Sequence, residues 1–257
     1  MLRVEKESTL SAGEEQKTSY SQDSALIVLR STAACPLIVD APQGAVSEYF
    51  GMLRARLLGA RSRSDFRSVI ITSPQKQDGK TFTSINLAIS LGQLQQMRIL
   101  LVDGDLRRCG ITQTLELQRE VGLADFLQDW APFNECVKAT SISHLHVVPA
   151  GNISGEVLPG ILEGSGWPKF IEKAKEEFDL IIVDSVPVSA PIADFELLLN
   201  ACDAALLVVQ VRKTARESLN LTANRMQGKL LGLVVNHKEL PAQLDYYYSP
   251  LNATSKK

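Results

Sequence analysis

Gly79, Lys80 and Thr81 stand where the chain passes from one apolar pattern to another. Residues 68–73 are apolar and β-branched between turn residues, which predicts a short buried strand. Residues 81–96 place apolar side chains at helical spacing, which predicts a helix that covers a sheet. A strand, a loop with Gly-Lys-Thr and a helix can hold phosphates, because loop amides and the positive helix N-terminus face the anion. We expect Lys80 to contact the β- and γ-phosphates and the Thr81 hydroxyl to bind Mg²⁺.

Two further apolar runs end in carboxylates. One ends at Asp103-Gly-Asp105-Leu-Arg107, and a later one ends at Asp184. In open α/β sheets, ligands bind beyond the carboxyl ends of the strands. We therefore interpret the three strand ends as one phosphate and metal site. The alternative is a plain doubly wound domain in which these aspartates coincide by chance.

Short apolar strands alternate with helical patterns along the chain. This alternation predicts an α/β fold with a doubly wound, mainly parallel sheet flanked by helices. The expected strands are residues 68–73, 98–103, 144–149, 179–184, 204–211 and 230–235, and the expected helices are residues 47–58, 81–96, 122–130, 132–139, 168–178, 192–201 and 214–227.

Composition narrows the class of protein. The 257 residues and 45% apolar content suffice for one substantial domain, and the net charge of −2 argues against a nucleic-acid partner. Four scattered cysteines without metal-like spacing indicate reduced thiols. The N-terminus lacks a signal-peptide pattern, and the longest apolar region, residues 197–211, is interrupted by Asn200 and Asp203. We expect a soluble, cytoplasmic protein without a membrane span.

The sequence divides into three parts. Residues 1–44 are read as a mostly flexible tail, with an extra edge strand near residues 37–39 as the alternative. Residues 45–240 form the expected catalytic domain, and residues 241–257 form a C-terminal tail.

Residues 72–81, 86–88 and 101–108 together resemble the bacterial tyrosine kinases of capsule and exopolysaccharide synthesis. These kinases belong to the same branch of the P-loop NTPases as the MinD/ParA-type ATPases, and the resemblance covers about residues 46–236. It implies a sheet of the P-loop NTPase type, ATP and Mg²⁺ as cofactors, and phosphoryl transfer to protein tyrosine. It also implies a homo-oligomer activated by a membrane-spanning polysaccharide co-polymerase, the regulator of chain length.

The resemblance assigns roles to single residues. Nucleotide binding would fall to Asp78, Gly79, Lys80, Thr81, Phe82 and, at the adenine, Asn236, which could equally be a simple loop asparagine. The metal would be held by Thr81, Asp103 and Asp184. Catalysis would use Lys80 at the transferring phosphate and Asp184 at the metal. Asp103 would either position the metal or accept the tyrosine proton. Asp105 is the second candidate for accepting this proton.

Three adjacent tyrosines, Tyr246, Tyr247 and Tyr248, follow the last expected strand. They could be a small packing clamp, or they could accept phosphate, which would add nearly two negative charges each. We expect them to be phosphorylated in trans by a neighbouring subunit, and accumulated phosphate to loosen the assembly.

The chain also departs from the family pattern. Gln77 replaces a usual glycine, which costs on the order of 1 kcal/mol if the backbone needs a positive φ there. The family helix motif E-x-x-R-x-x-R has Glu48 and Arg54 here but Gly51 at its first arginine, which bears on ring assembly. Two alternatives remain at this point: a MinD/ParA-like ATPase switch, which usually has a lysine where Gln75 stands, and a nucleotide-binding regulator without kinase activity.

Overall fold

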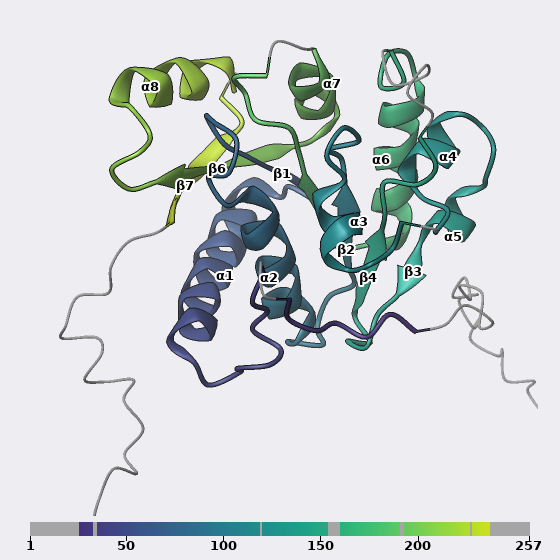
Figure 1. Ribbon diagram of the computed structural model, residues 1–257, viewed down its shortest axis with the longest axis horizontal. Coiled ribbons are helices and arrows are strands. Elements are labelled where there is room, and N and C mark those ends of the chain that lie inside the picture. Colours follow the sequence, from purple (N-terminus) through teal and green to yellow (C-terminus); the bar gives the residue numbers. More distant parts are fainter. Residues whose placement is uncertain are drawn as a thin grey trace, which may run out of the picture.

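The structure is a computed structural model that describes residues 26–32, 35–118, 120–153, 160–190, 193–226 and 228–236. Its centre is a seven-stranded sheet with the order β3-β4-β2-β5-β1-β6-β7 (Figure 1). Every neighbouring pair is parallel except β3 with β4, so the expected mainly parallel sheet is confirmed. The strands are β1 (Ser68–Thr72), β2 (Ile99–Asp103), β3 (Lys138–Ala139), β4 (Leu145–Val148), β5 (Leu180–Asp184), β6 (Ala204–Gln210) and β7 (Leu230–Asn236).

The three strands that carry the expected site lie side by side at the centre. All five residues of β1, β2 and β5 are buried, because helices cover both faces of a parallel sheet. Strand β5 pairs with β2 on one side and with β1 on the other. Their carboxyl ends therefore meet at one edge of the sheet, as the sequence predicted.

Helices cover the sheet on both faces, with α1 and α2 together on one of them (Figure 1). Side chains of α1 and α2 pack on one apolar cluster, and those of α4 to α7 pack on the other, which contains Trp167, Phe170 and Phe195. The helices are α1 (Ala45–Ser64), α2 (Lys80–Gly92), α3 (Gly110–Thr114), α4 (Leu123–Leu127), α5 (Phe133–Cys136), α6 (Gly166–Glu177), α7 (Asp194–Ala201) and α8 (Arg216–Arg225).

Two local expectations were wrong. The helix predicted over residues 132–139 stops at Cys136, because Lys138 and Ala139 pair antiparallel with β4 and form the sheet edge. The helix predicted over residues 47–58 is longer, because α1 begins at Ala45 with Gly44 as its N-cap and ends at Ser64. The short helix α3 was not predicted at all, since five residues are too few for a periodic pattern.

Part of the segment before α1 packs on the domain. The backbone N–H of Ile38 donates to Asn86 Oδ1 (2.8 Å), and Asn86 Nδ2 donates to the carbonyl of Pro36 (3.2 Å). Leu37 and Ile38 are buried, and no strand forms over residues 37–39. The packed domain therefore begins before the boundary expected at residue 45.

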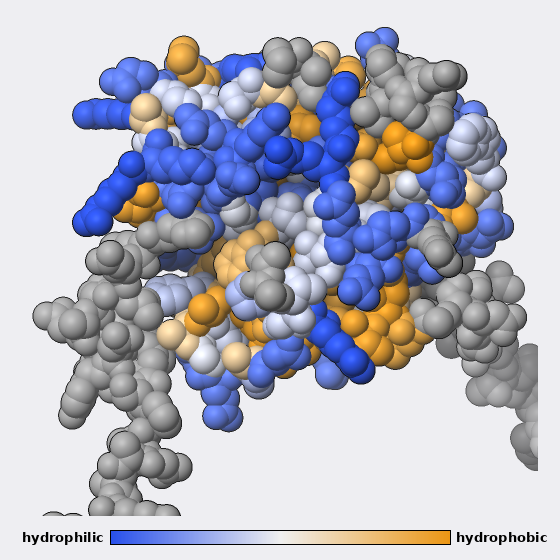
Figure 2. Space-filling view, in the orientation of Figure 1, coloured by the Kyte–Doolittle hydropathy of each residue, from blue (hydrophilic) through white to orange (hydrophobic). Residues whose placement is uncertain are grey.

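The surface is mainly polar. Figure 2 shows a face on which hydrophilic side chains predominate and apolar ones gather in small areas. Within the described ranges, none of the helices is long and apolar enough to cross a membrane. All four cysteines are free thiols, and burial raises the pKa of Cys202 to about 12.

Candidate active site

The loop between β1 and α2 is shaped by two positive-φ residues. Gly79 has φ 98° and forms the N-cap of α2, a conformation that glycine adopts without steric cost. Gln77 has φ 65°, so the backbone position discussed above does require the left-handed region. Asp78 closes the loop, because its Oδ2 accepts the N–H of Gln75 at 3.0 Å.

Asn236, at the end of β7, contacts this loop. Its Nδ2 donates to the backbone carbonyl of Asp78 at 3.1 Å. A Cβ added at Gly79 would overlap the same amide group. Asn236 thus braces the phosphate loop in the structure, and contact with an adenine stays a prediction.

Thr81 and Asp184 are joined directly. The Thr81 hydroxyl donates to Asp184 Oδ2 at 2.6 Å, and the Ser84 hydroxyl lies 3.1 Å from Asp184 Oδ1. Both hydroxyls come from the first turns of α2, and the Ser84 hydroxyl also lies 3.0 Å from the Lys80 carbonyl. This helix therefore fixes Asp184 mainly through the Thr81 hydroxyl. Sequence reasoning had not singled out Ser84, although its place one turn after Lys80 could have suggested it.

Asp103 lies beside Asp184, because the two are register partners on β2 and β5. Both are buried, and parallel strands lie about 4.8 Å apart. Burial, aided by the charge of Asp184, raises the pKa of Asp103 to about 8. Burial also raises the pKa of Asp184 to about 6, against the opposing charge of Lys80. Two adjacent buried carboxyls of this kind favour a bound cation or a shared proton.

Asp105 has a different environment. Its Oδ1 accepts the N–H of Arg108 at 3.1 Å, which closes the turn after β2. Burial raises its pKa, opposed by that hydrogen bond and by the charge of Lys80. Lys80 itself is nearly buried, at 8% exposure. The ammonium group therefore lies in a site rich in negative charge, where it can face a phosphate.

The residues fit a magnesium ion bound together with a nucleotide. Among the described residues, no group of three or more His, Cys, Asp or Glu is arranged to hold a metal alone. In nucleotide-binding sites, Mg²⁺ is usually bound by one or two carboxylates together with phosphate oxygens and water. Asp103 Oδ1 is buried without a hydrogen-bond partner in the described structure, and Thr81 keeps its lone pairs while it donates to Asp184. Hard oxygen donors are thus present at the expected place.

Helix α3 adds two residues that the sequence reasoning missed. A Cβ at Gly110 would lie 2.6 Å from Thr81 Oγ1, so α3 packs directly on the start of α2. Thr112 donates to Asp103 Oδ2 from its hydroxyl at 2.7 Å and from its backbone at 2.8 Å. Nothing in the local sequence distinguishes these two positions.

Other expected residues have other contacts. Arg107 forms an ion pair with Asp194, with its Nε 2.8 Å from Asp194 Oδ2. The ring of Phe82 packs edge-on against Phe50 of α1, and its contact with a nucleotide stays a prediction. Arg54 donates to the carbonyl of Ser90 at 2.7 Å. Residues 246–248 lie outside the described residues.

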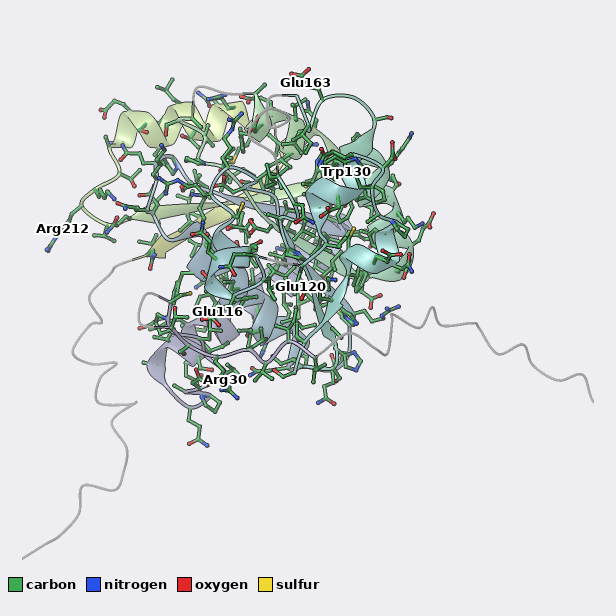
Figure 3. All side chains as sticks on the ribbon, turned by 45° about the vertical axis from the view of Figure 1, so that its right-hand side comes forward. Arg30, Glu116, Glu120, Trp130, Glu163 and Arg212 are labelled. Carbon is green, nitrogen blue, oxygen red and sulfur yellow. The ribbon has the colours of Figure 1, made fainter. Side chains whose placement is uncertain are left out.

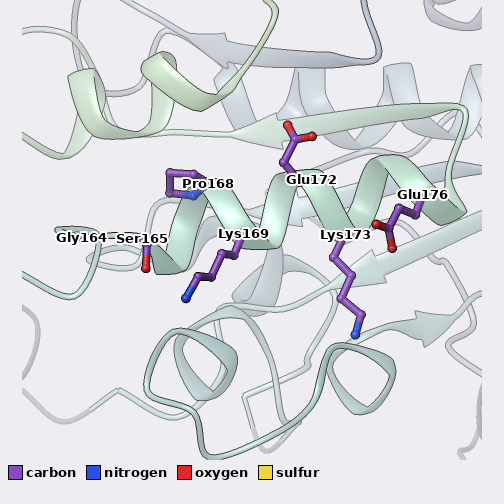
Figure 4. Close-up of a pocket in the computed structure, with 7 residues that line it drawn as sticks. All are labelled: Gly164, Ser165, Pro168, Lys169, Glu172, Lys173 and Glu176. Atoms are coloured by element: carbon purple, nitrogen blue, oxygen red, sulfur yellow. The ribbon is translucent and has the colours of Figure 1, made fainter.

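The groove along α6 lacks this chemistry. A groove of about 650 Å³ follows α6 and is lined by Lys169, Glu172, Lys173 and Glu176 (Figure 4). These side chains are exposed, as expected for a solvated helix face. Charged residues such as Arg30 and Glu163 likewise lie at the outside of the molecule (Figure 3). Burial sets the carboxylates beside Thr81 apart from these surface charges.

Comparison with known proteins identifies the family of the chain. The family described as an AAA domain matches residues 68–229. The tyrosine-protein kinase YwqD of Bacillus subtilis is 31% identical over 211 residues, which cover 80% of this chain and 87% of that protein. The tyrosine-protein kinase CpsD of Streptococcus agalactiae serotype III is 30% identical over 193 residues, 74% of this chain and 81% of that protein.

Solved structures share the fold. A chimeric protein described as CapA2B2 aligns with a TM-score of 0.73 at 23% identity, covering 84% of this chain and 95% of its own. The kinase domain of the Escherichia coli tyrosine kinase ETK gives 0.71 at 24% identity, covering 79% and 82%. The septum site-determining protein MinD of Pyrococcus horikoshii, solved with Mg-ADP, gives 0.55 at 19% identity, covering 72% and 77%.

Proposed function

This chain belongs to the bacterial tyrosine kinases of capsule synthesis, and from that premise we propose that it is an ATP-dependent autokinase acting on its own C-terminal tyrosines. Membership makes it a protein-tyrosine kinase of the P-loop branch. The acceptors that we propose are Tyr246, Tyr247 and Tyr248 of a neighbouring subunit. Through this transfer the protein would regulate the synthesis and chain length of a polysaccharide.

The observation that carries the proposal is the group formed by Thr81, Asp184 and Asp103 beside Lys80. Phosphoryl transfer depends on alignment and charge neutralisation more than on covalent chemistry by the protein. Lys80 and the amides at the start of α2 would hold the phosphates of ATP. Thr81 and Asp184 would hold Mg²⁺, which when bound neutralises charge on the phosphate oxygens.

The acceptor tyrosine must lose its proton. The tyrosine oxygen forms a bond to the γ-phosphorus, the bond from that phosphorus to the β–γ bridging oxygen breaks, and ADP leaves. We assign the proton to Asp103 Oδ1, because this atom is buried without a hydrogen-bond partner in the described structure. Asp105 is the weaker candidate, since its Oδ1 already accepts the N–H of Arg108. A pKa raised to about 8 makes the ionised form of Asp103 a stronger base than an ordinary aspartate, which suits that form to accepting the tyrosine proton.

Assembly and partner are further parts of the proposal. Membership of this kinase family supports a membrane-spanning co-polymerase as the activator. That partner would also bring the kinase to the inner face of the membrane. A homo-oligomer would supply the neighbouring active site. The helix contact of the family would be altered in it, because Arg54 donates to Ser90 of its own subunit and Gly51 carries no charge.

The two alternatives are less well supported. A MinD/ParA-like switch shares the fold, but the relatives near 30% identity are named tyrosine kinases. A regulator without kinase activity would not need the buried carboxylate pair and the two hydroxyls that hold Asp184.

The test uses the full chain with ATP and Mg²⁺, with and without the cytoplasmic segment of the co-polymerase, followed by detection of phosphotyrosine. We expect label on the wild type, and none on Lys80→Ala or on the variant with all three tail tyrosines changed to phenylalanine. Label on that triple variant at the wild-type level would move the acceptor elsewhere. An unlabelled wild type under both conditions would overturn the proposed autokinase.

A further inference from the structure

We propose that Thr112 is a positioning residue for the kinase reaction, which orients Asp103 so that only its Oδ1 is presented to the reacting groups. This inference rests on the proposed function, because it concerns the carboxylate assigned there. It starts from three short hydrogen bonds that meet at one buried threonine.

Thr112 holds one oxygen of Asp103 with both of its donors. The Thr112 hydroxyl lies 2.7 Å from Asp103 Oδ2, and the Thr112 backbone N–H donates to the same oxygen at 2.8 Å. Thr112 is 3% exposed and Asp103 is fully buried. In a site that excludes water, these bonds fix the rotation of the carboxylate. Oδ2 is occupied, and Oδ1 is left without a protein partner in the described structure.

The direction of the hydroxyl is fixed from its other side. The backbone N–H of Ala150 donates to Thr112 Oγ1 at 2.7 Å. A hydroxyl has one proton, and an N–H can only donate, so the proton of Thr112 is free to point at Asp103. Valine at this position would keep the backbone donor to Asp103, would remove the hydroxyl donor, and would leave the Ala150 N–H buried without its acceptor.

Ala150 is in turn held rigidly. Its carbonyl accepts the N–H of Ala124 at 2.8 Å, at the start of α4. Asn152 lies two residues after Ala150. It donates to the Asp125 carboxylate of α4 from its backbone N–H at 3.0 Å and from its side-chain amide at 2.9 Å. The segment after β4 is therefore anchored to α4. Through its hydrogen bonds to Ala150 and Asp103, Thr112 connects this anchored segment to the end of β2.

A merely structural threonine would satisfy the Ala150 N–H and nothing more. Three variants separate the two roles. Thr112→Val removes the hydroxyl with little change of shape, and Thr112→Ser keeps it. Thr114→Val is the matched control, because the Thr114 hydroxyl on the same helix donates to the Gly110 carbonyl at 2.7 Å and has no hydrogen bond to Asp103.

Two readouts are measured on the full chain, with thermal unfolding as the check of folding. The first is the affinity of the ADP complex for Mn²⁺, followed by the magnetic resonance signal of the free ion. The second is kcat and KM for ATP in the phosphorylation of the Lys80→Ala chain. Loss of an orienting hydrogen bond of this kind commonly costs about 10- to 100-fold in metal affinity or activity.

We expect Thr112→Val to lose about 10- to 100-fold in kcat or in Mn²⁺ affinity, with KM for ATP within about threefold of the wild type. Thr112→Ser and Thr114→Val should match the wild type in both. A loss of Mn²⁺ affinity places Asp103 at the metal, and a loss of kcat alone places it at the tyrosine proton.

The proposal is overturned if Thr112→Val equals Thr114→Val in both readouts, or if Thr112→Ser is as impaired as Thr112→Val. A wild type that binds Mn²⁺ and ADP but phosphorylates nothing would contradict the proposed function. In that case the Mn²⁺ affinities of the same variants still decide the role of Thr112.

Discussion

The hydroxyl of Thr81 donates a hydrogen bond of 2.6 Å to Asp184, which joins the start of α2 to the end of β5. The two residues are 103 positions apart in the sequence, and this bond brings the first turn of α2 against β5. Because the hydroxyl donates its proton to the carboxylate, its lone pairs remain for a cation. In the proposed site, this bond would prepare Thr81 as a metal ligand before any nucleotide arrives.

Replacing Thr81 tests this preparation. We expect Thr81→Val to weaken Mg-ADP binding by about 10- to 100-fold, because the hydroxyl that would contact the metal is gone. Binding of ADP without Mg²⁺ should change less, since the loop amides and Lys80 remain. Titration calorimetry with and without Mg²⁺ measures both values. Thr81→Ser should restore the metal-dependent gain, and a gain that survives in Thr81→Val would show that the hydroxyl is not a ligand.

Gly110 offers a test from the side of α3. A Cβ at this position would lie 2.6 Å from Thr81 Oγ1 and 3.2 Å from its methyl group, so Gly110→Ala must displace the threonine or the helix. We expect about a tenfold loss in Mg-ADP affinity. Gly51→Ala on α1 is the control, because nothing lies within 4 Å of a Cβ there.

That control should even stabilise the protein, by up to about 1 kcal/mol, since alanine favours a helix over glycine. Equal Mg-ADP affinities for the two alanine variants would mean that α3 does not shape the site. A large loss of unfolding temperature in Gly110→Ala would instead point to general damage, which the unfolding scan detects.

The sequence predicted the strand ends well because the information is local. Apolar β-branched runs that end in Asp103 and Asp184 mark buried strands, and a parallel sheet must bring such ends to one edge. The positive φ at Gln77 could also be anticipated from the glycine that usually stands there. These features depend on residues that are close together in the chain.

The contacts that orient the site could not be predicted, because they depend on packing between distant segments. Thr112 and Gly110 belong to a helix too short to leave a pattern. Asn236 reaches a loop carbonyl 158 residues away, and Asn86 holds a segment before α1. Each of these contacts depends on how the helices and loops pack against the sheet.

Asp103 should make the stability of the protein without nucleotide depend on pH. Its pKa is raised from 3.8 to about 8 in the folded state, so the folded state holds a proton that the unfolded chain has released. Stability is then greatest at low pH and falls as the pH rises through 8. The slope from one such group is about 1.4 kcal/mol per pH unit, or roughly 3–5 °C in unfolding temperature for a chain of this size.

The window from pH 6.5 to 8 avoids most of the titration of Asp184 and His146. The pKa of Asp184 is raised only to about 6, mainly by burial, so it is largely ionised there. Burial lowers the pKa of His146 to about 4, so its contribution to the stability of the protein rises with pH only below the ordinary pKa of 6.5. Scans of unfolding temperature should fall across the window in the wild type and stay nearly flat in Asp103→Asn. The same decline in both proteins would assign the effect to another group.

Transfer between subunits is the last prediction, and it concerns Tyr246, Tyr247 and Tyr248. We mix the Lys80→Ala chain, which keeps its tyrosines, with an active chain whose three tail tyrosines are phenylalanine. Neither protein should label itself, because one lacks the lysine that holds the phosphates and the other lacks the acceptors. Phosphotyrosine on the Lys80→Ala chain therefore requires transfer in trans, and its rate should rise with protein concentration. A mixture without label, while the wild type labels itself equally at every dilution, would leave only transfer within one chain.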